Sequence, residues 1–327
     1  MIVGTPAAQV GVILLTVLGL WIGARLLTDA GVRLARRFGL SELTVGLTIV
    51  ALGTSMPELA VSVDAALKGT GDIAVGNVLG SNIYNVAFIL GVLSLIRVLP
   101  IADSLVRRDG AALLGSALLG AVVISDLRVT RVEGAVLALA FVAYTGYLLR
   151  AARGESAAEN RPREPGEAVP LATGRASVRG RDAIAFVAGL AIVLVSGDFL
   201  VLAASELARS AGISEWVIGG TIVAAGTSTP EFAVSLVAVT RGSVGVSVGN
   251  VIGSNVLNVT GILGVAALVR PLATSPAALE TLAWLVAITV LLVAALWTGR
   301  ALSRLEGGLL AGSEVVRWVL GLFGAIG

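Results

Sequence analysis

The stretch GTSMPE, residues 53–58, lies in the middle of the apolar run LTVGLTIVALGTSMPELAVSVDAAL, which is otherwise typical of a membrane-spanning helix. A charged side chain at the centre of a bilayer costs roughly 2.5–3.5 kcal/mol on insertion scales, and a proline there removes a helix hydrogen bond. A second copy, GTSTPE, occupies residues 226–231, again inside an apolar run. The repetition indicates that the polar break serves a function.

The composition is that of an integral membrane protein. Of the 327 residues, 56% are hydrophobic and 13% are charged, whereas soluble domains are about 45–50% apolar and about 25% charged. The chain has no cysteine and no histidine, which excludes disulfides and the commonest transition-metal ligands. Any metal ion bound here is therefore expected to have oxygen ligands. We interpret the arginines as topology signals and not as nucleic-acid contacts.

The apolar segments predict an all-α polytopic membrane protein, because about 20 apolar residues cross a bilayer as a helix. We expect the first segment to be a retained helix, since no positively charged region precedes it as in a signal peptide. The ten predicted spans are 8–28, 43–67, 73–96, 109–125, 131–150, 181–207, 216–240, 244–268, 278–298 and 303–325.

The distribution of basic residues predicts how these spans are oriented. Loops on one side of the predicted membrane carry sixteen arginines, and those on the other side carry five lysines and arginines. Basic residues accumulate in cytoplasmic loops. The prediction is a multi-pass protein of the cell's inner (plasma) membrane with both termini outside.

The only long polar segment divides the chain into two. Residues 152–179 contain three prolines and mixed charges, a composition that cannot bury a core. We expect this segment to be a flexible cytoplasmic linker. It would separate a first repeat, residues 1–151, from a second repeat, residues 180–327.

The two halves are copies of one unit. A constant offset of 173 residues relates Glu58 to Glu231, and GNVLGSNIYN (76–85) to GNVIGSNVLN (249–258). Each half has five predicted spans, an odd number, so the second copy must enter the membrane from the opposite face. Ten helices in two inverted-topology repeats are typical of secondary transporters, whose sites lie near the midplane where interrupted helices meet.

The prolines of the two motifs should loosen the helix backbone around them. Pro57 and Pro230 cannot donate hydrogen bonds, and the kinks should also free neighbouring carbonyls such as those of Ala51 and Ala224. A free carbonyl inside a bilayer needs a partner. A cation is one such partner.

The polar side chains near the motifs share helix faces. Residues four apart lie on one face of a helix, and this spacing relates Thr54 to Glu58 and Ser81 to Asn85, with the same pairs in the second repeat. All potential ligands are oxygen atoms, which suits Ca²⁺ better than Mg²⁺. Two carboxylates balance one Ca²⁺ or two Na⁺. Because an empty site with two bare carboxylates is costly in a low-dielectric medium, the pattern favours coupled exchange.

The paired motifs resemble those of the cation/Ca²⁺ exchanger superfamily, in particular prokaryotic sodium/calcium exchangers, over essentially the whole chain. The resemblance implies ten helices with the second, third, seventh and eighth around the ions, and Ca²⁺ and Na⁺ as transported ions with no permanently bound cofactor. It implies Glu58 and Glu231 as central carboxylates, Thr54 and Thr227 as Ca²⁺ ligands, Ala51, Ser55 and Ser81 at one Na⁺ site, Ala224, Ser228 and Ser254 at the other, and Asn85 at the waist of the cavity.

One position departs from the family pattern. Asn258, the repeat mate of Asn85, stands where such exchangers often have aspartate, so two carboxylates are present instead of three. A Ca²⁺/H⁺ antiporter, whose carboxylates titrate near the working pH, therefore stays open beside the Na⁺-coupled one. A passive cation channel is a further alternative. An enzyme is not expected, because no histidine could activate a serine. The expected partners are the lipid bilayer and inorganic cations, and no protein partner is implied.

Several other charged residues have structural interpretations. Glu133 and Glu306 begin predicted helices, where carboxylates suit the helix dipole. Glu314 and Arg317 are spaced to form an i,i+3 pair. Asp198 has Arg25 as its repeat mate and is not expected to bind an ion directly.

Overall fold

A computed structural model describes residues 5–159, 180–211 and 224–322, and within them the fold is helical. The first half contains α1 (Pro6–Phe38), α2 (Glu42–Val45), η1 (Gly46–Val50), α3 (Ala51–Thr54), α4 (Met56–Lys68), α5 (Gly71–Ile83), η2 (Tyr84–Ile89), α6 (Leu90–Ile96), η3 (Leu105–Asp109), α7 (Gly110–Ile124) and α8 (Arg131–Glu159). The second half contains α9 (Arg181–Ser210), α11 (Ala224–Thr227), α12 (Thr229–Thr240), α13 (Val244–Val256), η5 (Leu257–Ile262), α14 (Leu263–Val269), α15 (Ala277–Gly299) and α16 (Arg304–Leu322).

These elements correspond to the ten predicted spans, and the all-α polytopic fold is confirmed. In the described residues, six helices are long and apolar enough to cross a membrane individually, and a seventh span is formed by two helices bent by 47°. The remaining spans are shorter or interrupted. Residues 216–223 and 323–325 of the seventh and tenth predicted spans lie outside the described residues.

The predicted linker is only partly described. Helix α8 continues to Glu159, so the first eight residues assigned to the linker are helical. Its remainder, 160–179, lies outside the described residues.

The polar motifs interrupt their helices as the sequence predicts. Between α3 and α4, Ser55 has φ −83° and ψ 13°, and between α11 and α12, Ser228 has φ −89° and ψ 9°. Pro57 and Pro230 follow each break, in the first turn of the new helix, where a missing N–H costs little. Each motif thus creates a short helix, a one-residue break and a new helix N-terminus inside the protein.

Four short strands join the two halves reciprocally. Strand β1 (Leu99–Pro100) pairs antiparallel with β4 (Ala301–Leu302), and β2 (Arg128–Val129) pairs with β3 (Leu272–Ala273). The 173-residue offset relates β1 to β3 and β2 to β4. Each strand therefore pairs with the repeat mate of the other strand in its own half.

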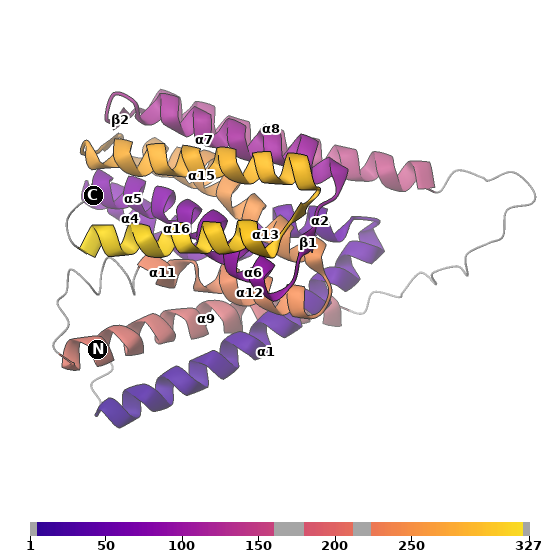
Figure 1. The fold of residues 1–327 in the computed structure, drawn as a ribbon, viewed down its shortest axis with the longest axis horizontal. Helices are drawn as coiled ribbons and strands as arrows, with labels where there is room; N and C mark the ends of the chain where they lie inside the picture. The colour runs from indigo at the N-terminus through magenta and orange to yellow at the C-terminus, as the bar shows by residue number, and fades with distance from the viewer. Residues whose placement is uncertain (1–4, 160–179, 212–223, 323–327) are drawn as a thin grey trace, which may run out of the picture.

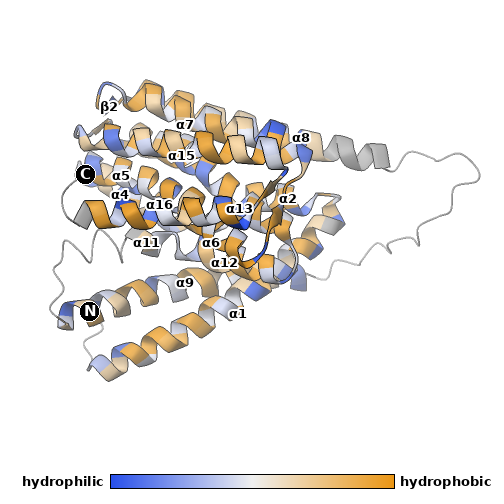
Figure 2. Ribbon diagram, viewed as in Figure 1, coloured by the Kyte–Doolittle hydropathy of each residue, from blue (hydrophilic) through white to orange (hydrophobic). Residues whose placement is uncertain are grey.

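The spans that contain α5 and α13, with the GNVLGSN and GNVIGSN motifs, are the most buried of the six long apolar spans in the described residues. In their most apolar windows, the span containing α13 is 89% buried and the span containing α5 is 72% buried, whereas α1 and α9 are each 28% buried. Figure 1 shows α1 and α9 side by side at the edge of the bundle. Figure 2 shows apolar residues along the outer helices, which fits a surface that contacts lipid. The site is therefore built in the protein's most buried layer.

The directions of the helices agree with an inverted repeat. Helix α1 begins and α16 ends on one side of the bundle, whereas α8 ends and α9 begins on the other side, called here the linker side (Figure 1). The adjacent helices α1 and α9, which are repeat mates, run in opposite directions (Figure 1).

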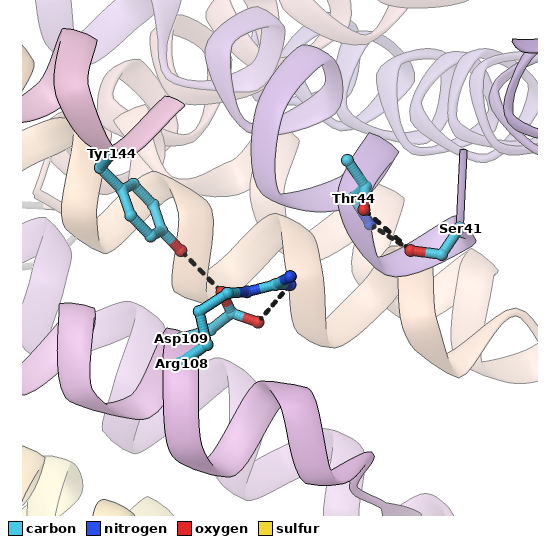
Figure 3. A network of polar contacts seen from close by, with 5 residues as sticks. All are labelled: Ser41, Thr44, Arg108, Asp109 and Tyr144. Carbon is cyan, nitrogen blue, oxygen red and sulfur yellow. Dashed lines mark hydrogen bonds and ion pairs between the residues drawn. The ribbon is translucent and has the colours of Figure 1, made fainter. Parts of the chain in front are cut away.

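A buried aspartate, paired with the adjacent arginine, links the fourth span to the fifth through a tyrosine hydroxyl (Figure 3). Asp109 is fully buried, accepts hydrogen bonds from Arg108 Nε at 2.8 Å and Nη2 at 3.0 Å, and accepts another from the Tyr144 hydroxyl at 3.1 Å. Nearby, Ser41 caps α2 by accepting from the Thr44 N–H at 3.0 Å. A buried carboxylate needs this number of donors, so the cluster holds η3, α7 and α8 in one arrangement.

Candidate cation site

The two interrupted helices meet, and each carboxylate reaches the serine of the opposite repeat. The Ser55 hydroxyl donates to Glu231 Oε1 at 2.8 Å, and the Ser228 hydroxyl donates to Glu58 Oε1 at 3.0 Å. All four side chains are completely buried. The site is therefore symmetric between the halves, with one carboxylate and one serine from each.

The second oxygen of each carboxylate has no protein donor. Glu58 Oε2 and Glu231 Oε2 are buried and lack a hydrogen-bond partner in the described part of the chain. An isolated ionised carboxylate in a dry interior is very unfavourable. These two oxygens consequently need a cation or a proton.

Hydroxyl groups surround the carboxylates. Ser254 Oγ lies 3.0 Å from Ser55 Oγ and 3.4 Å from Glu231 Oε1. Ser81, the repeat mate of Ser254, has its Oγ 3.5 Å from Thr227 Oγ1. The structure thus brings the predicted serines together with the carboxylates.

Thr54 and Ala51 both form hydrogen bonds within the protein. The Thr54 hydroxyl donates to Asn250 Oδ1 at 3.0 Å, with the carbonyl oxygens of Val50 and Ala51 at 3.2 and 3.4 Å. The Ala51 carbonyl also accepts from the Ser55 N–H at 3.1 Å. The prediction that the kink frees this carbonyl is therefore wrong. Ala224 begins α11, directly after a stretch outside the described residues.

Four buried asparagines lie on the two spans that contain α5 and α13: Asn82, Asn85, Asn255 and Asn258. Asn82 Nδ2 donates to the Asn255 carbonyl at 3.0 Å, and Asn85 Nδ2 lies 3.5 Å from Asn255 Oδ1. Both side-chain polar atoms of Asn258 lack a partner among the described residues, and so does Asn85 Oδ1. Asn85 and Asn258 lie on the π-helical segments η2 and η5, a backbone form found often at functional sites. These asparagines offer unpaired polar atoms, and within the part of the chain that the structure describes, Glu58 and Glu231 alone supply carboxylates at the site.

Two residues that sequence reasoning did not assign hold the motifs in place. Asn77 Nδ2 donates to the Glu58 carbonyl at 3.1 Å and to Ser62 Oγ at 2.9 Å. Its mate Asn250 donates to the Glu231 carbonyl at 3.3 Å and to Ser235 Oγ at 3.0 Å. Asn77 and Asn250 occupy the same place in the two GN dipeptides, 173 residues apart. This repetition could have identified both residues from the sequence.

The remaining charged residues have the expected structural roles. Glu133 accepts from the Thr130 N–H and Glu306 accepts from the Ser303 N–H, both at 2.8 Å, as helix-capping contacts. Glu314, fully buried, pairs with Arg317 at 2.6 Å. Asp198 is exposed on α9.

The comparison with known families agrees with the geometry. The model of the family described as sodium/calcium exchanger protein matches residues 8–150 and 182–315, which include both motifs. The chain belongs to this family. It is a membrane transporter of the exchanger type, as the sequence motifs indicated.

Individual relatives cover almost the whole exchanger. A putative antiporter, CaxA, of Alkalimonas amylolytica is 35% identical over 318 residues, which are 95% of this chain and 96% of CaxA. The sodium/calcium exchanger MaX1 of Methanosarcina acetivorans is 31% identical over 84% of this chain and 87% of its own. Among solved structures, the sodium–calcium exchanger NCX_Mj superposes with a TM-score of 0.80 at 28% identity, over 94% of this chain and 97% of that one. The ten-helix exchanger fold is therefore shared.

Proposed function

We propose that this exchanger moves Ca²⁺ across the membrane in exchange for Na⁺, at the site formed by the two GTSxPE motifs. The observation that carries the proposal is the reciprocal pair Glu58 and Glu231, each buried with one unpaired carboxylate oxygen. The surrounding donors are oxygen atoms, which is the ligand chemistry that Ca²⁺ prefers. The relative MaX1, named a sodium/calcium exchanger, supports the choice of ions.

Alternation between the two ions follows from charge balance. One Ca²⁺ or two Na⁺ neutralise two carboxylates, whereas an empty site leaves two charges in a low-dielectric interior. The barrier to reorienting the empty site is therefore high, and the loaded forms reorient. Alternating access by movement of one group of helices against the other is the behaviour of inverted-repeat transporters.

A proton-coupled exchanger is the second candidate, and Asn258 is the observation that favours it. With asparagine here, the site has two carboxylates, so three Na⁺ would leave an uncompensated charge. Two protons would neutralise the same pair. The name of the relative CaxA, an antiporter without a stated ion, is compatible with either coupling.

The orientation proposed for the exchanger has both termini outside and residues 152–179 in the cytoplasm. The excess of arginines on the linker side supports it.

The decisive experiment is Ca²⁺ uptake into proteoliposomes loaded with Na⁺, with Na⁺-free vesicles and vesicles carrying only a pH gradient as controls. Glu58→Gln and Glu231→Gln should each reduce uptake by at least about 100-fold. Each substitution removes one of the two negative charges that balance the cation in a buried, low-dielectric site. Arg150→Gln, an exposed change far from the site, should leave uptake unchanged.

Each control separates the candidates. Uptake that requires internal Na⁺ supports the Na⁺-coupled exchanger, and uptake driven by the pH gradient alone assigns the protein to the proton-coupled type. Full activity of both Gln variants would contradict the proposed site. Absence of Ca²⁺ flux under every gradient would exclude Ca²⁺ as the substrate.

A further inference from the structure

A pocket of about 390 Å³ lies between α1 and the end of α12, away from the candidate cation site. Its lining consists of Trp21 and Arg25 from α1, of Val237 and Thr240 from the end of α12, and of Arg241, which follows α12. Two of the five lining side chains are therefore guanidinium groups.

The positive charge in this pocket is not fully compensated. Arg241 pairs with Asp29 at 3.0 Å. Arg25 is exposed on α1, with its guanidinium carbon 5.4 Å from the centre of the Trp21 ring, and it forms no ion pair within the described residues. One positive charge is therefore left for an external anion.

The pocket lies at the level where a membrane span ends. Arg241 follows the last residue of α12, and Gly242 and Ser243 lead directly into α13. On α1, the apolar stretch ends near residue 28 and is followed by Asp29 and Arg33. Tryptophan and arginine at this depth are typical of the boundary between hydrocarbon and lipid headgroups.

An apolar track on α1 leads to the pocket. Leu14, Leu18, Trp21 and Arg25 are spaced four, three and four residues apart, which places them on one helix face. Leu14 is 66% exposed, Leu18 52% and Trp21 52%. This face can contact an acyl chain whose headgroup lies at Arg25.

We propose that this pocket binds the phosphodiester headgroup of an anionic phospholipid from the leaflet on the linker side. Arg25 and Arg241 contact the phosphate, since guanidinium groups form strong charge-assisted hydrogen bonds with phosphate oxygens. Trp21 contacts the glycerol region of the lipid, and Leu18 and Leu14 contact its acyl chain. Soluble phosphate has the same headgroup chemistry but cannot use the apolar track.

The test measures lipid binding directly by native mass spectrometry of the purified full-length protein in detergent. The protein is titrated with phosphatidylglycerol, with phosphatidylcholine of the same acyl chains, and with soluble glycerol 3-phosphate. Arg25→Gln removes the unpaired charge, and Arg25→Lys restores it. Arg150→Gln is the matched control, because Arg150 is an exposed arginine of α8, a helix at the opposite edge of the bundle from α1 (Figure 1).

The wild type is expected to bind phosphatidylglycerol more tightly than phosphatidylcholine. Arg25→Gln should weaken phosphatidylglycerol binding about fivefold, the effect of one basic side chain near a membrane surface, while Arg25→Lys retains most of the affinity. Arg150→Gln should bind phosphatidylglycerol as tightly as the wild type does. Arg25→Gln should not change the affinity for phosphatidylcholine, and glycerol 3-phosphate should not bind.

Three results would overturn the proposal. Equal affinity of the wild type for the two lipids would exclude a headgroup site. An equal loss of phosphatidylglycerol affinity in Arg25→Gln and Arg150→Gln would show that the lipid is attracted to the basic surface in general. Tight binding of glycerol 3-phosphate would show a site for soluble phosphate. None of these results depends on which ions the exchanger transports.

Discussion

Each carboxylate accepts a hydrogen bond from a serine of the opposite repeat, and this could not be predicted from the sequence. The four-residue spacing of Thr54 and Glu58 predicted one shared helix face, but the structure places Thr54 at the end of α3 and Glu58 in α4, on either side of the break at Ser55. The bonds from Ser55 to Glu231 and from Ser228 to Glu58 depend on how two distant helices pack. Local periodicity contains no information on that register, whereas the repetition itself identified the residue types.

Asn250 supports a prediction at this scale. It binds the Glu231 carbonyl, Ser235 Oγ and the Thr54 hydroxyl. Asn250→Ala removes all three of these buried hydrogen bonds, and we expect a cost of about 1–3 kcal/mol. We expect a lower unfolding temperature and an apparent KM for Ca²⁺ raised by about tenfold or more, measured by thermal denaturation and by uptake into proteoliposomes.

Ser235→Ala is the control for that variant. It removes one of the three contacts of Asn250, so its effects should be clearly smaller. Wild-type KM and stability in Asn250→Ala would refute the positioning role.

At the level of helices, the breaks are predictable and the π-helical turns are not. Proline and glycine identify the breaks at Ser55 and Ser228 directly. The segments η2 and η5 each add a residue to a helical turn, with no proline in either segment to indicate the change. On η2, Tyr84 and Phe88 stack with Trp318 of α16, at ring distances of 6.0 and 5.8 Å. Such tertiary contacts are not visible in the periodicity of one segment.

The same scale explains the glycines of GNVIGSN in the second repeat. A Cβ at Gly249 would come within 2.6 Å of the Leu43 carbonyl oxygen, and one at Gly253 within 2.5 Å of that of Leu47. Both obstacles are backbone atoms that cannot rotate away. These glycines therefore set the distance between α13 and the helix that carries the first motif.

Gly249→Ala and Gly253→Ala should each destabilise the protein by about 1–3 kcal/mol, the usual cost of overpacking. Gly115→Ala is the matched control, because a Cβ there meets nothing within 4 Å and the residue is exposed on α7. It should be neutral or slightly stabilising. Fluorescence-detected thermal unfolding measures all three, and equal melting temperatures for the variants and the control would contradict the packing argument.

For the whole molecule, the sequence predicted the two five-span halves, and its least apolar span is explained by the structure. The last predicted span, 303–325, contains Glu306, Glu314 and Arg317. Glu306 caps the start of α16, and Glu314 is buried against Arg317, so neither carboxylate faces lipid unpaired. Hydropathy alone treats these charges as evidence against a span, because it cannot register that they are paired.

The orientation can be tested on intact cells, because the chain has no cysteine to replace first. Lys68, at the end of α4, and Arg107, in η3, are exposed on opposite sides of the bundle. A membrane-impermeant maleimide should label Lys68→Cys in intact cells and Arg107→Cys only after permeabilisation, as the excess of basic residues on the linker side requires. The reverse labelling pattern would invert the proposed orientation.

The reciprocal pairing of the four strands has a consequence for the origin of the protein. Because β1 pairs with β4 and β2 with β3, the contact between the halves is isologous, as between the subunits of a two-fold dimer. Two separate five-helix chains of identical sequence, inserted in opposite directions, could form both strand pairs with the contact surfaces that each chain already has. Gene duplication and fusion would then only have joined subunits that already recognised each other, and each half would afterwards have been free to diverge.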